Sequence, residues 1–284
     1  MLEYVPPMPR KKSRSLRARI VRVATVTADM REEMWRLFAR YYDDVSREMF
    51  LSDLGRKRHV ILMRDANDRS IQGFSTLAVY DQTVGGRRVV AVFSGDTIVD
   101  RAYWGQTALH RAFVRYVLWQ WVRHALLGGR SVYWFLITKG YRTYLLLSRT
   151  FPEHWPRHEC PTPQWELDLL GLVARDLFGD AYRPELGVLQ FESASGCLKK
   201  GVASIDEAML REPDIAFFAR KNAGYARGDE LCCLGKVDVP FFAFFARKQL
   251  KRFYSGSRRS SGVAASGVPS STADHAEIAR PFTN

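Results

Sequence analysis

The sequence predicts an α/β protein built on one mixed, mainly antiparallel sheet that is flanked by helices. Three strand-like segments, 59–65, 70–82 and 89–100, are joined only by ANDRS and by the Gly-Gly sequence TVGGRR, as in an antiparallel meander. A long apolar helix is expected over 104–127. The following segment, SVYWFLIT at 131–138, has no alternation and so reads as a strand buried on both faces. A strand, a helix and a second strand in this order predict one parallel crossover.

Other segments complete the expected order of elements. RIVRVATV at 19–26 alternates and reads as a first strand, and Thr27 is expected to cap the helix that follows it. The remaining expected helices are 139–151, 166–179, 206–222 and 239–253, and the remaining expected strands are 187–193 and 228–237.

The chain divides into one domain and two tails. Residues 1–17 are basic and predicted to be disordered, residues 18–254 form a single domain with a C-terminal extension from about 152, and residues 255–284 are rich in Ser, Gly and Ala and predicted to be disordered. With 284 residues, the chain is long enough for one large domain and an appendage.

The net charge of +13 is concentrated near the two ends of the chain. Residues 1–23 carry +6, residues 247–259 carry another +6, and the stretch between them is nearly neutral. Such termini suit contact with an anionic membrane surface or a nucleic acid. The alternative is that they only solubilise the protein.

The sequence favours a cytoplasmic location. Its four cysteines form no C-x-x-C pair, which suits reduced thiols. The basic N-terminus is not followed by the apolar stretch of a secretory signal, and no uncharged run approaches the roughly 18 residues of a membrane span.

The order of elements, together with the turn Tyr103-Trp104-Gly105-Gln106-Thr107-Ala108, resembles the GNAT-type N-acyltransferases. The resemblance covers 19–151 well and 152–237 loosely. It implies that the strand before the long helix separates from its parallel neighbour and that the pantetheine arm of an acyl donor enters the opening. It also implies that the turn at the helix N-terminus binds the donor's phosphate, because free N–H groups and the helix dipole favour anions there.

The resemblance assigns the donor-binding residues. Gly105 matches a family glycine, Gln106 stands where a polar or basic residue is usual, and Trp104 and Thr107 complete the turn. Lys139 follows the parallel strand and is a candidate for a phosphate contact, with a solvated side chain as the alternative. Thr107 and Leu109 stand where further family glycines would be. The donor is therefore acyl-CoA or an acyl carrier protein, which presents one phosphate instead of a diphosphate. A relic that binds no donor is a third interpretation.

Asp96 is the candidate general base. Strict alternation would place Ser94, Asp96 and Ile98 on one face of their strand. A carboxylate inside an apolar strand is costly unless it is paired or used, and near the opening it would accept a proton from an attacking amine. The alternative is a structural carboxylate that pairs with an arginine or caps a turn.

The resemblance further implies that a tyrosine on the next helix protonates the leaving thiolate. Tyr144 is the first choice and Tyr141 the second, and packing is the alternative for both. The spacing of His154, His158 and Cys160 is compact enough for zinc, but the segment is rich in proline and offers no fourth ligand, so no metal is expected.

These observations predict an N-acyltransferase that moves an acyl group from acyl-CoA or an acyl carrier protein to an amine acceptor by direct attack. One alternative is a non-enzymatic binding protein of the same fold, attached to nucleic acid or membrane through its basic termini. Another is lipid acylation on a hydroxyl or a lipid amine.

Overall fold

The computed structural model describes residues 14–42, 45–191 and 205–248. Residues 1–13 and 255–284, which cover most of the two predicted disordered tails, lie outside the described residues. Residues 14–17 are described, and the first strand already begins at Leu16, so the predicted N-terminal tail was a few residues too long.

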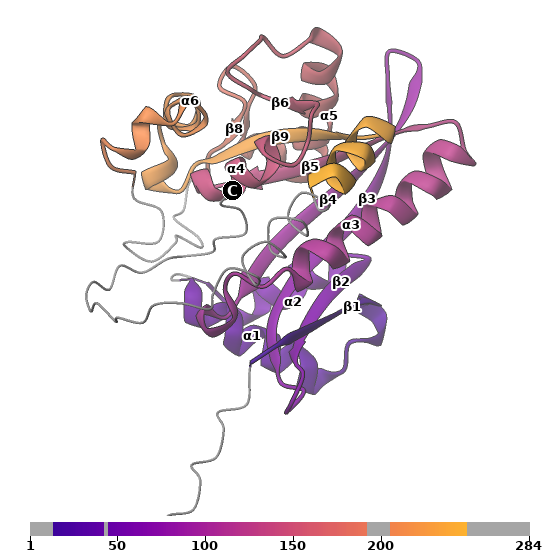
Figure 1. Cartoon of the computed structure of the whole chain (residues 1–284), viewed down its shortest axis with the longest axis vertical. Coiled ribbons are helices and arrows are strands. Elements are labelled where there is room, and N and C mark those ends of the chain that lie inside the picture. The colour runs from indigo at the N-terminus through magenta and orange to yellow at the C-terminus, as the bar shows by residue number, and fades with distance from the viewer. Residues whose placement is uncertain (1–13, 43–44, 192–204, 249–284) are drawn as a thin grey trace, which may run out of the picture.

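One mixed sheet runs through the whole molecule (Figure 1). Its order is β1-β2-β3-β4-β5-β9-β8-β7, and β6 pairs with β9 beside this path. Only the pair β4–β5 is parallel among the described strands, as the single crossover predicted. The strands are β1 (Leu16–Arg22), β2 (His59–Asp65), β3 (Ile71–Val84), β4 (Arg87–Val99), β5 (Ser131–Thr138), β6 (His154–Trp155), β7 (Tyr182–Arg183), β8 (Val188–Leu189) and β9 (Glu230–Val237). The fold class predicted from the sequence is confirmed.

Helices cover both faces of the sheet. One face packs against α3, α4, α6 and the helical residues 239–248, and the other packs against α1, α2 and α5. The helices are α1 (Ala28–Tyr41), α2 (Arg47–Arg56), α3 (Ala108–Trp121), α4 (Tyr141–Ser148), α5 (Gln164–Phe178) and α6 (Pro213–Lys221). Central strands such as β4 and β5 are therefore buried on both sides, which explains their apolar sequences.

Local signals account for the first two helices. The Thr27 hydroxyl accepts a hydrogen bond from the Met30 amide, so the predicted cap of α1 is confirmed. The sequence reading missed α2, whose N-cap Ser46 accepts from the Met49 amide. Phe50 and Leu54, one helical turn apart, bury its inner face.

Several predicted boundaries were wrong. Asp100 caps a short 3-10 turn over Arg101–Tyr103, so the long helix begins at Ala108, not at 104. It ends in a π-helical turn, Val122–Leu126. The first strand ends at Arg22. Of the predicted strand 187–193, residues 187–191 are described, and within them only Val188–Leu189 form a strand. The predicted helix 206–222 forms only from Pro213, which suits the first helical position.

None of the helices in the described part of the chain has the length and apolar character needed to cross a membrane.

Candidate active site

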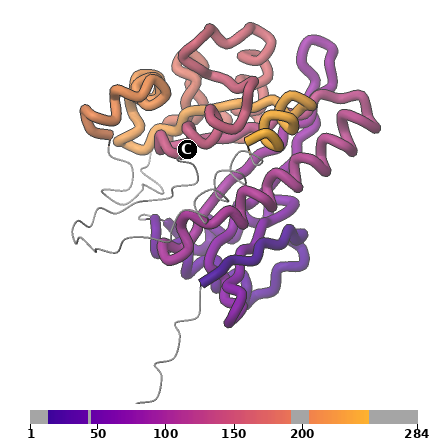
Figure 2. The backbone as a smooth tube through the Cα atoms, viewed as in Figure 1, coloured from indigo at the N-terminus to yellow at the C-terminus, as the bar shows by residue number. Residues whose placement is uncertain are grey.

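The parallel strands β4 and β5 separate partway along their length. Their pairing begins at Val89 with Ser131 and ends at Ser94 with Leu136. Beyond this point β4 continues to Val99 beside β3, and β5 continues to Thr138 beside β9. The backbone trace shows the two strands leading into the lower and upper parts of the molecule (Figure 2). The separation implied by the sequence resemblance is therefore present.

A β-bulge lies where the strands part. Ser75 of β3 is opposite Thr97, but Leu77 is opposite Ser94, so β4 contains one extra residue here. A methyl group added to Gly95 would lie 2.6 Å from the Thr76 hydroxyl, and this explains the glycine at this position. The side chains that follow the bulge on β4 therefore point to the opposite face from the one that strict alternation would give.

The predicted common face of Ser94 and Asp96 is therefore wrong. The Trp134 indole N–H donates to the Ser94 hydroxyl on the face that carries α3 and α4. Asp96 instead turns toward α2 on the opposite face, and Ile98 follows it into the core beneath α1 and α2. Alternation failed here because the extra residue shifts the phase of the strand by one.

Asp96 meets a second carboxylic acid from α2. Its side chain is half-buried and shares a hydrogen bond with Asp53. The Lys57 ammonium donates to Asp53 Oδ1 at 2.8 Å and lies 5.1 Å from the centre of the Phe93 ring. The Lys57 side chain is only 8% exposed. We call Asp53, Lys57 and Asp96 the carboxylate pair and its lysine.

The surroundings favour the protonated form of Asp96. Burial and the negative charge of Asp53 raise the pKa of Asp96 to about 7, although the Lys57 charge acts in the opposite direction. The charge of Glu230 also raises the pKa of Asp96, by less than the charge of Asp53 does. A carboxyl group that titrates near neutral pH suits proton transfer.

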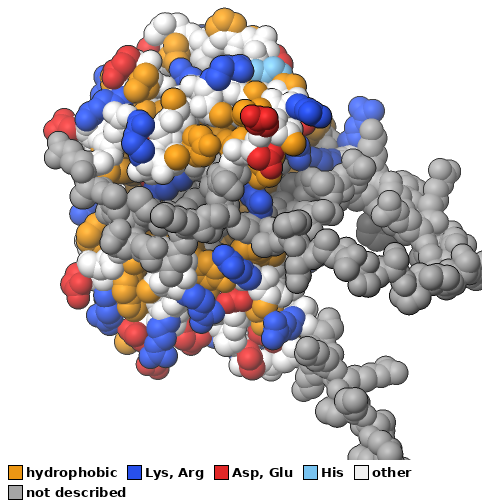
Figure 3. Space-filling view, turned by 90° about the vertical axis from the view of Figure 1, so that its left-hand side faces the viewer, with side chains coloured by type: hydrophobic (Ala, Val, Ile, Leu, Met, Phe, Trp, Pro, Cys, Tyr) orange, Lys and Arg blue, Asp and Glu red, His pale blue; other side chains and the backbone are white. Residues whose placement is uncertain are grey.

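A buried ion pair lies on the other side of the opening. Lys139 follows β5 directly, and its ammonium lies 3.4 Å from Glu230 at the start of β9. Burial raises the pKa of Glu230, and Lys139 acts against this. Tyr42, at the end of α1, is influenced from both sides of the opening. Burial raises the pKa of its phenol, and the charges of Asp96 and Glu230 raise it further. Lysine and arginine side chains lie on both the upper and the lower part of the face toward which the strands open (Figure 3).

The turn before α3 has a clear structural basis. Gly105 has φ +82°, a conformation that glycine adopts at little cost. The Trp104 indole N–H donates to the Val99 carbonyl, and the Arg101 guanidinium lies over its ring. Thr107 precedes α3 and makes no side-chain cap. The first N–H groups of α3 are thus not capped by this residue.

Gln106 holds the first strand in place. Its side-chain oxygen accepts from the Leu16 amide at 2.8 Å, and its side-chain nitrogen donates to the Arg14 carbonyl at 3.1 Å. These bonds join the turn to the edge strand β1. We therefore assign Gln106 to the support of the turn and not to phosphate binding.

The two candidate tyrosines of α4 have different surroundings. Tyr144 is fully buried between Phe217 and Phe218, and its hydroxyl donates to the Pro156 carbonyl at 3.0 Å. The hydroxyl of Tyr141 instead accepts a hydrogen bond from Arg142. Tyr141 lies in the first turn of α4, just past the end of β5.

The histidine and cysteine candidates point to separate partners. His154 is buried and bonds the Phe151 carbonyl, His158 bonds Asp214, and Arg157 donates to Cys160. Among the residues that the structure describes, no group of His, Cys, Asp and Glu side chains is arranged to hold a metal ion.

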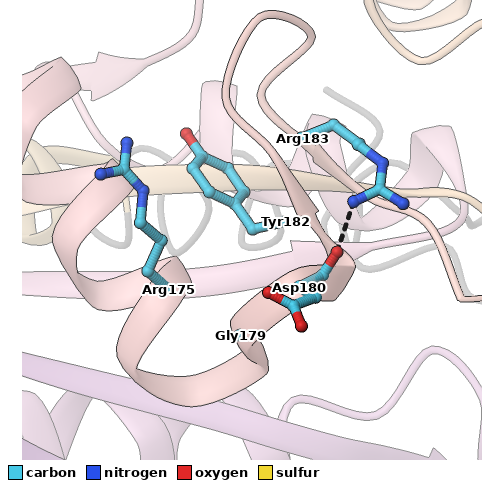
Figure 4. Close-up of a pocket in the computed structure, with 5 residues that line it drawn as sticks. All are labelled: Arg175, Gly179, Asp180, Tyr182 and Arg183. Atoms are coloured by element: carbon cyan, nitrogen blue, oxygen red, sulfur yellow. Dashed lines mark hydrogen bonds between the residues drawn. The ribbon is translucent and has the colours of Figure 1, made fainter.

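A shallow hollow of about 320 Å³ lies elsewhere, at the C-terminal end of α5 (Figure 4). Its arginines have neighbours of their own, because Arg175 lies over the Tyr182 ring and Arg183 donates to the Asp180 carbonyl. The hollow adds no residue to the opening between β4 and β5.

Sequence reasoning found Asp96 and Lys139 but missed their partners. Asp53 lies on α2 and Lys57 directly follows this helix, both more than 35 residues before Asp96, whereas Glu230 lies far beyond it. The spacing of Asp53 and Lys57, four residues apart, was the available signal for an ion pair on a helix. Nothing local indicated that this helix packs beneath the bulge.

The chain matches no protein-family model and no curated protein. Among solved structures it is similar to a probable N-acyltransferase from Enterococcus faecalis, with 14% identity, a TM-score of 0.36, and coverage of 48% of this chain and 33% of that one. A GCN5-related N-acetyltransferase from Kribbella flavida is 18% identical, with a TM-score of 0.35 and coverage of 50% of this chain and 34% of that one. A Trypanosoma brucei acetyltransferase is 17% identical, with a TM-score of 0.33 and coverage of 52% of this chain and 98% of that one. The match thus spans about a third of the first two proteins. Of these three proteins, the one from Kribbella flavida is named as GCN5-related.

Proposed function

We propose that the protein is an N-acyltransferase that uses the opening between β4 and β5 to bring an acyl thioester and an amine together. The observation that carries this proposal is the half-buried Asp96, which lies at the point where the strands part and has a pKa of about 7. A carboxyl group with this pKa accepts a proton near neutral pH without being so basic that it stays protonated.

The donor would enter between the strands with its phosphate end at the start of α3. The free N–H groups there and the positive end of the helix dipole attract an anion. Thr107, Trp104 and the backbone of Gly105 would shape this contact, and Lys139 would add positive charge from the β5 side. The donor is acyl-CoA or an acyl carrier protein, each of which presents a pantetheine thioester.

The amine would attack the thioester carbonyl directly. A bond forms between the amine nitrogen and the carbonyl carbon, and the bond from that carbon to sulfur breaks. Asp96 takes the proton that the nitrogen loses, and backbone N–H groups of β4 beyond Ser94 steady the oxyanion. The thiolate needs a proton in return.

Tyr141 is the better candidate for that proton donor. The Tyr144 hydroxyl is already committed to the Pro156 carbonyl inside the core, whereas the Tyr141 hydroxyl accepts from Arg142 and keeps its own proton for donation.

The first test is release of free thiol from acetyl-CoA and from a long-chain acyl-CoA, with a panel of primary amines as acceptors. Amine-dependent release by the unaltered chain, lost in Asp96→Asn while CoA binding measured by calorimetry is kept, is the expected result. Asp176→Asn removes an exposed carboxylate of α5 and serves as the matched control. Equal rates for Asp96→Asn and Asp176→Asn would remove Asp96 from the mechanism.

A further inference from the structure

The segment from the 3-10 turn before α3 to the residue before β5 has an unusual charge pattern. Residues 101–130 contain five arginines and no acidic residue. In Figure 1, α3 runs diagonally from the middle of the molecule to its right-hand side, where the C-terminal end of the helix forms a corner. This end lies roughly 25 Å along the helix axis from the turn assigned to the donor, at about 1.5 Å per residue.

Large apolar side chains are exposed at this corner. Four of the eleven large hydrophobic side chains exposed in the described ranges lie within ten consecutive residues: Leu118 (41%), Trp119 (46%), Leu126 (64%) and Leu127 (78%). Leu118, Val122 and Leu126 are spaced by four residues and so share one stripe of the helix. We call Leu118, Trp119, Leu126 and Leu127 the apolar corner.

Arginines surround the apolar corner. The Arg123 guanidinium lies 5.8 Å from the Trp119 ring centre. Burial lowers the pKa of His59, whose ring contacts Trp119, and the charges of Arg58 and Arg22 lower it further. Burial also lowers the pKa of His124, and the charges of Arg130, Arg123 and Arg58 add to this effect. Arg22, Arg58 and Arg123 are therefore close enough to act on the two histidines beside the corner.

Four exposed arginines of α3, its π-helical turn and the neighbouring strand ends, which we call the rim arginines, have no acidic partner within the described part of the chain. Arg22, Arg58, Arg115 and Arg123 are in no ion pair there. Asp81 is the nearby acid, and it pairs with Arg130. The rim is thus free to meet an anionic partner.

We propose that this corner docks the protein onto an anionic lipid surface. Protruding leucines beside a tryptophan suit the boundary between headgroups and acyl chains, and unpaired arginines suit anionic headgroups. Two leucines that are 64% and 78% exposed offer nothing to the hydrogen-bonding edges of nucleic acid bases, so lipid is favoured over nucleic acid. The proposal does not rest on the acyltransferase activity.

The test is co-sedimentation of the full chain with vesicles of phosphatidylcholine alone and of phosphatidylcholine mixed with phosphatidylserine. We expect binding to the mixed vesicles that weakens with added salt. Leu126→Asp/Leu127→Asp should lower the partition coefficient at least about tenfold, and Arg123→Gln by about fivefold. Leu167→Asp/Leu186→Asp, at two exposed leucines outside the corner, is the matched control and should leave it unchanged.

Three outcomes would overturn the proposal. Equal loss of vesicle binding in both leucine variants, or no loss in either, would show that the corner is not the docking site. Binding to single-stranded RNA that falls with Arg123→Gln, combined with no vesicle binding, would assign the arginines to nucleic acid. A dimer of the unaltered chain that Leu126→Asp/Leu127→Asp converts to a monomer in sedimentation velocity, without any vesicle binding, would assign the corner to a second copy.

Discussion

Each side of the opening between β4 and β5 holds a half-buried carboxylate, and the two have neighbours of opposite charge. Asp96 on the β4 side meets another acid, Asp53, whereas Glu230 on the β9 side meets the lysine Lys139. Burial raises the pKa of both groups, but Asp53 pushes the pKa of Asp96 further up and Lys139 holds that of Glu230 back. The nearest charge thus separates a carboxylate suited to proton transfer from one that holds structure.

The largest expected effect is on turnover. Asp96→Asn should lower kcat by about 10² to 10⁴, the usual range for loss of a general base, and should leave CoA affinity unchanged. Glu230→Gln should keep kcat within about threefold, since Glu230 touches no reacting atom in this account. Thiol release at saturating donor checks both. A larger loss in Glu230→Gln than in Asp96→Asn would reverse the comparison.

The second effect is smaller and concerns the leaving group. Tyr141→Phe should lower kcat about tenfold to a hundredfold because the thiolate loses its proton donor. Tyr144→Phe is the matched control, since it removes only the bond to the Pro156 carbonyl and should destabilise the fold by about 1 kcal/mol. Steady-state kinetics and chemical denaturation of both variants check this. Turnover that falls only in Tyr144→Phe would return the role to Tyr144.

Replacing Glu230 and replacing Asp96 should have different effects on the free energy of unfolding. Glu230→Gln takes from Lys139 its buried carboxylate partner, and the side chains of the pair are only 16% and 13% exposed. We expect a loss of about 2 kcal/mol in the free energy of unfolding at neutral pH, measured in urea. Asp96→Asn removes a charge that the fold disfavours, so at pH 8 it should be neutral or stabilising. Equal destabilisation by the two changes would contradict this account.

The pH dependence of stability gives a finer test. Because the folded protein holds a proton on Asp96 up to about pH 7 and a free aspartate loses it near pH 4, the folded state binds more protons between these values. The free energy of unfolding contributed by this group is therefore fully present below about pH 4 and is lost as the pH rises through 7. Asp96→Asn should flatten the curve. Urea titrations at a series of pH values measure it, and an unchanged slope would count against the raised pKa.

Much of the fold followed from local patterns. The Gly-Gly turn at 85–86 predicted the hairpin of β3 and β4, and the unbroken apolar run at 131–138 predicted a strand buried on both faces. The cap at Thr27 was found for the same reason, since it depends only on adjacent residues. Such features are set within one or two turns of chain.

The active-site geometry could not be read in the same way. The bulge at Gly95 leaves the alternating sequence of β4 intact, so the opposite faces of Ser94 and Asp96 were hidden. Whether Asp96 meets Asp53 or an arginine depends on how α2 packs on the sheet, which is a tertiary contact. Gln106 was assigned to phosphate by resemblance, although it binds β1.

The most direct test of the central claim is the pH dependence of kcat/KM in the unaltered chain, Asp53→Asn and Glu230→Gln. We expect an acidic limb with a pKa of about 7 in the unaltered chain. It should move down by about one unit in Asp53→Asn, which removes both the charge and the hydrogen bond that favour the protonated form, and less in Glu230→Gln. An acidic limb at the same pH in all three proteins, or a larger shift in Glu230→Gln, would contradict the claim that the carboxylate pair at the bulge performs the proton transfer.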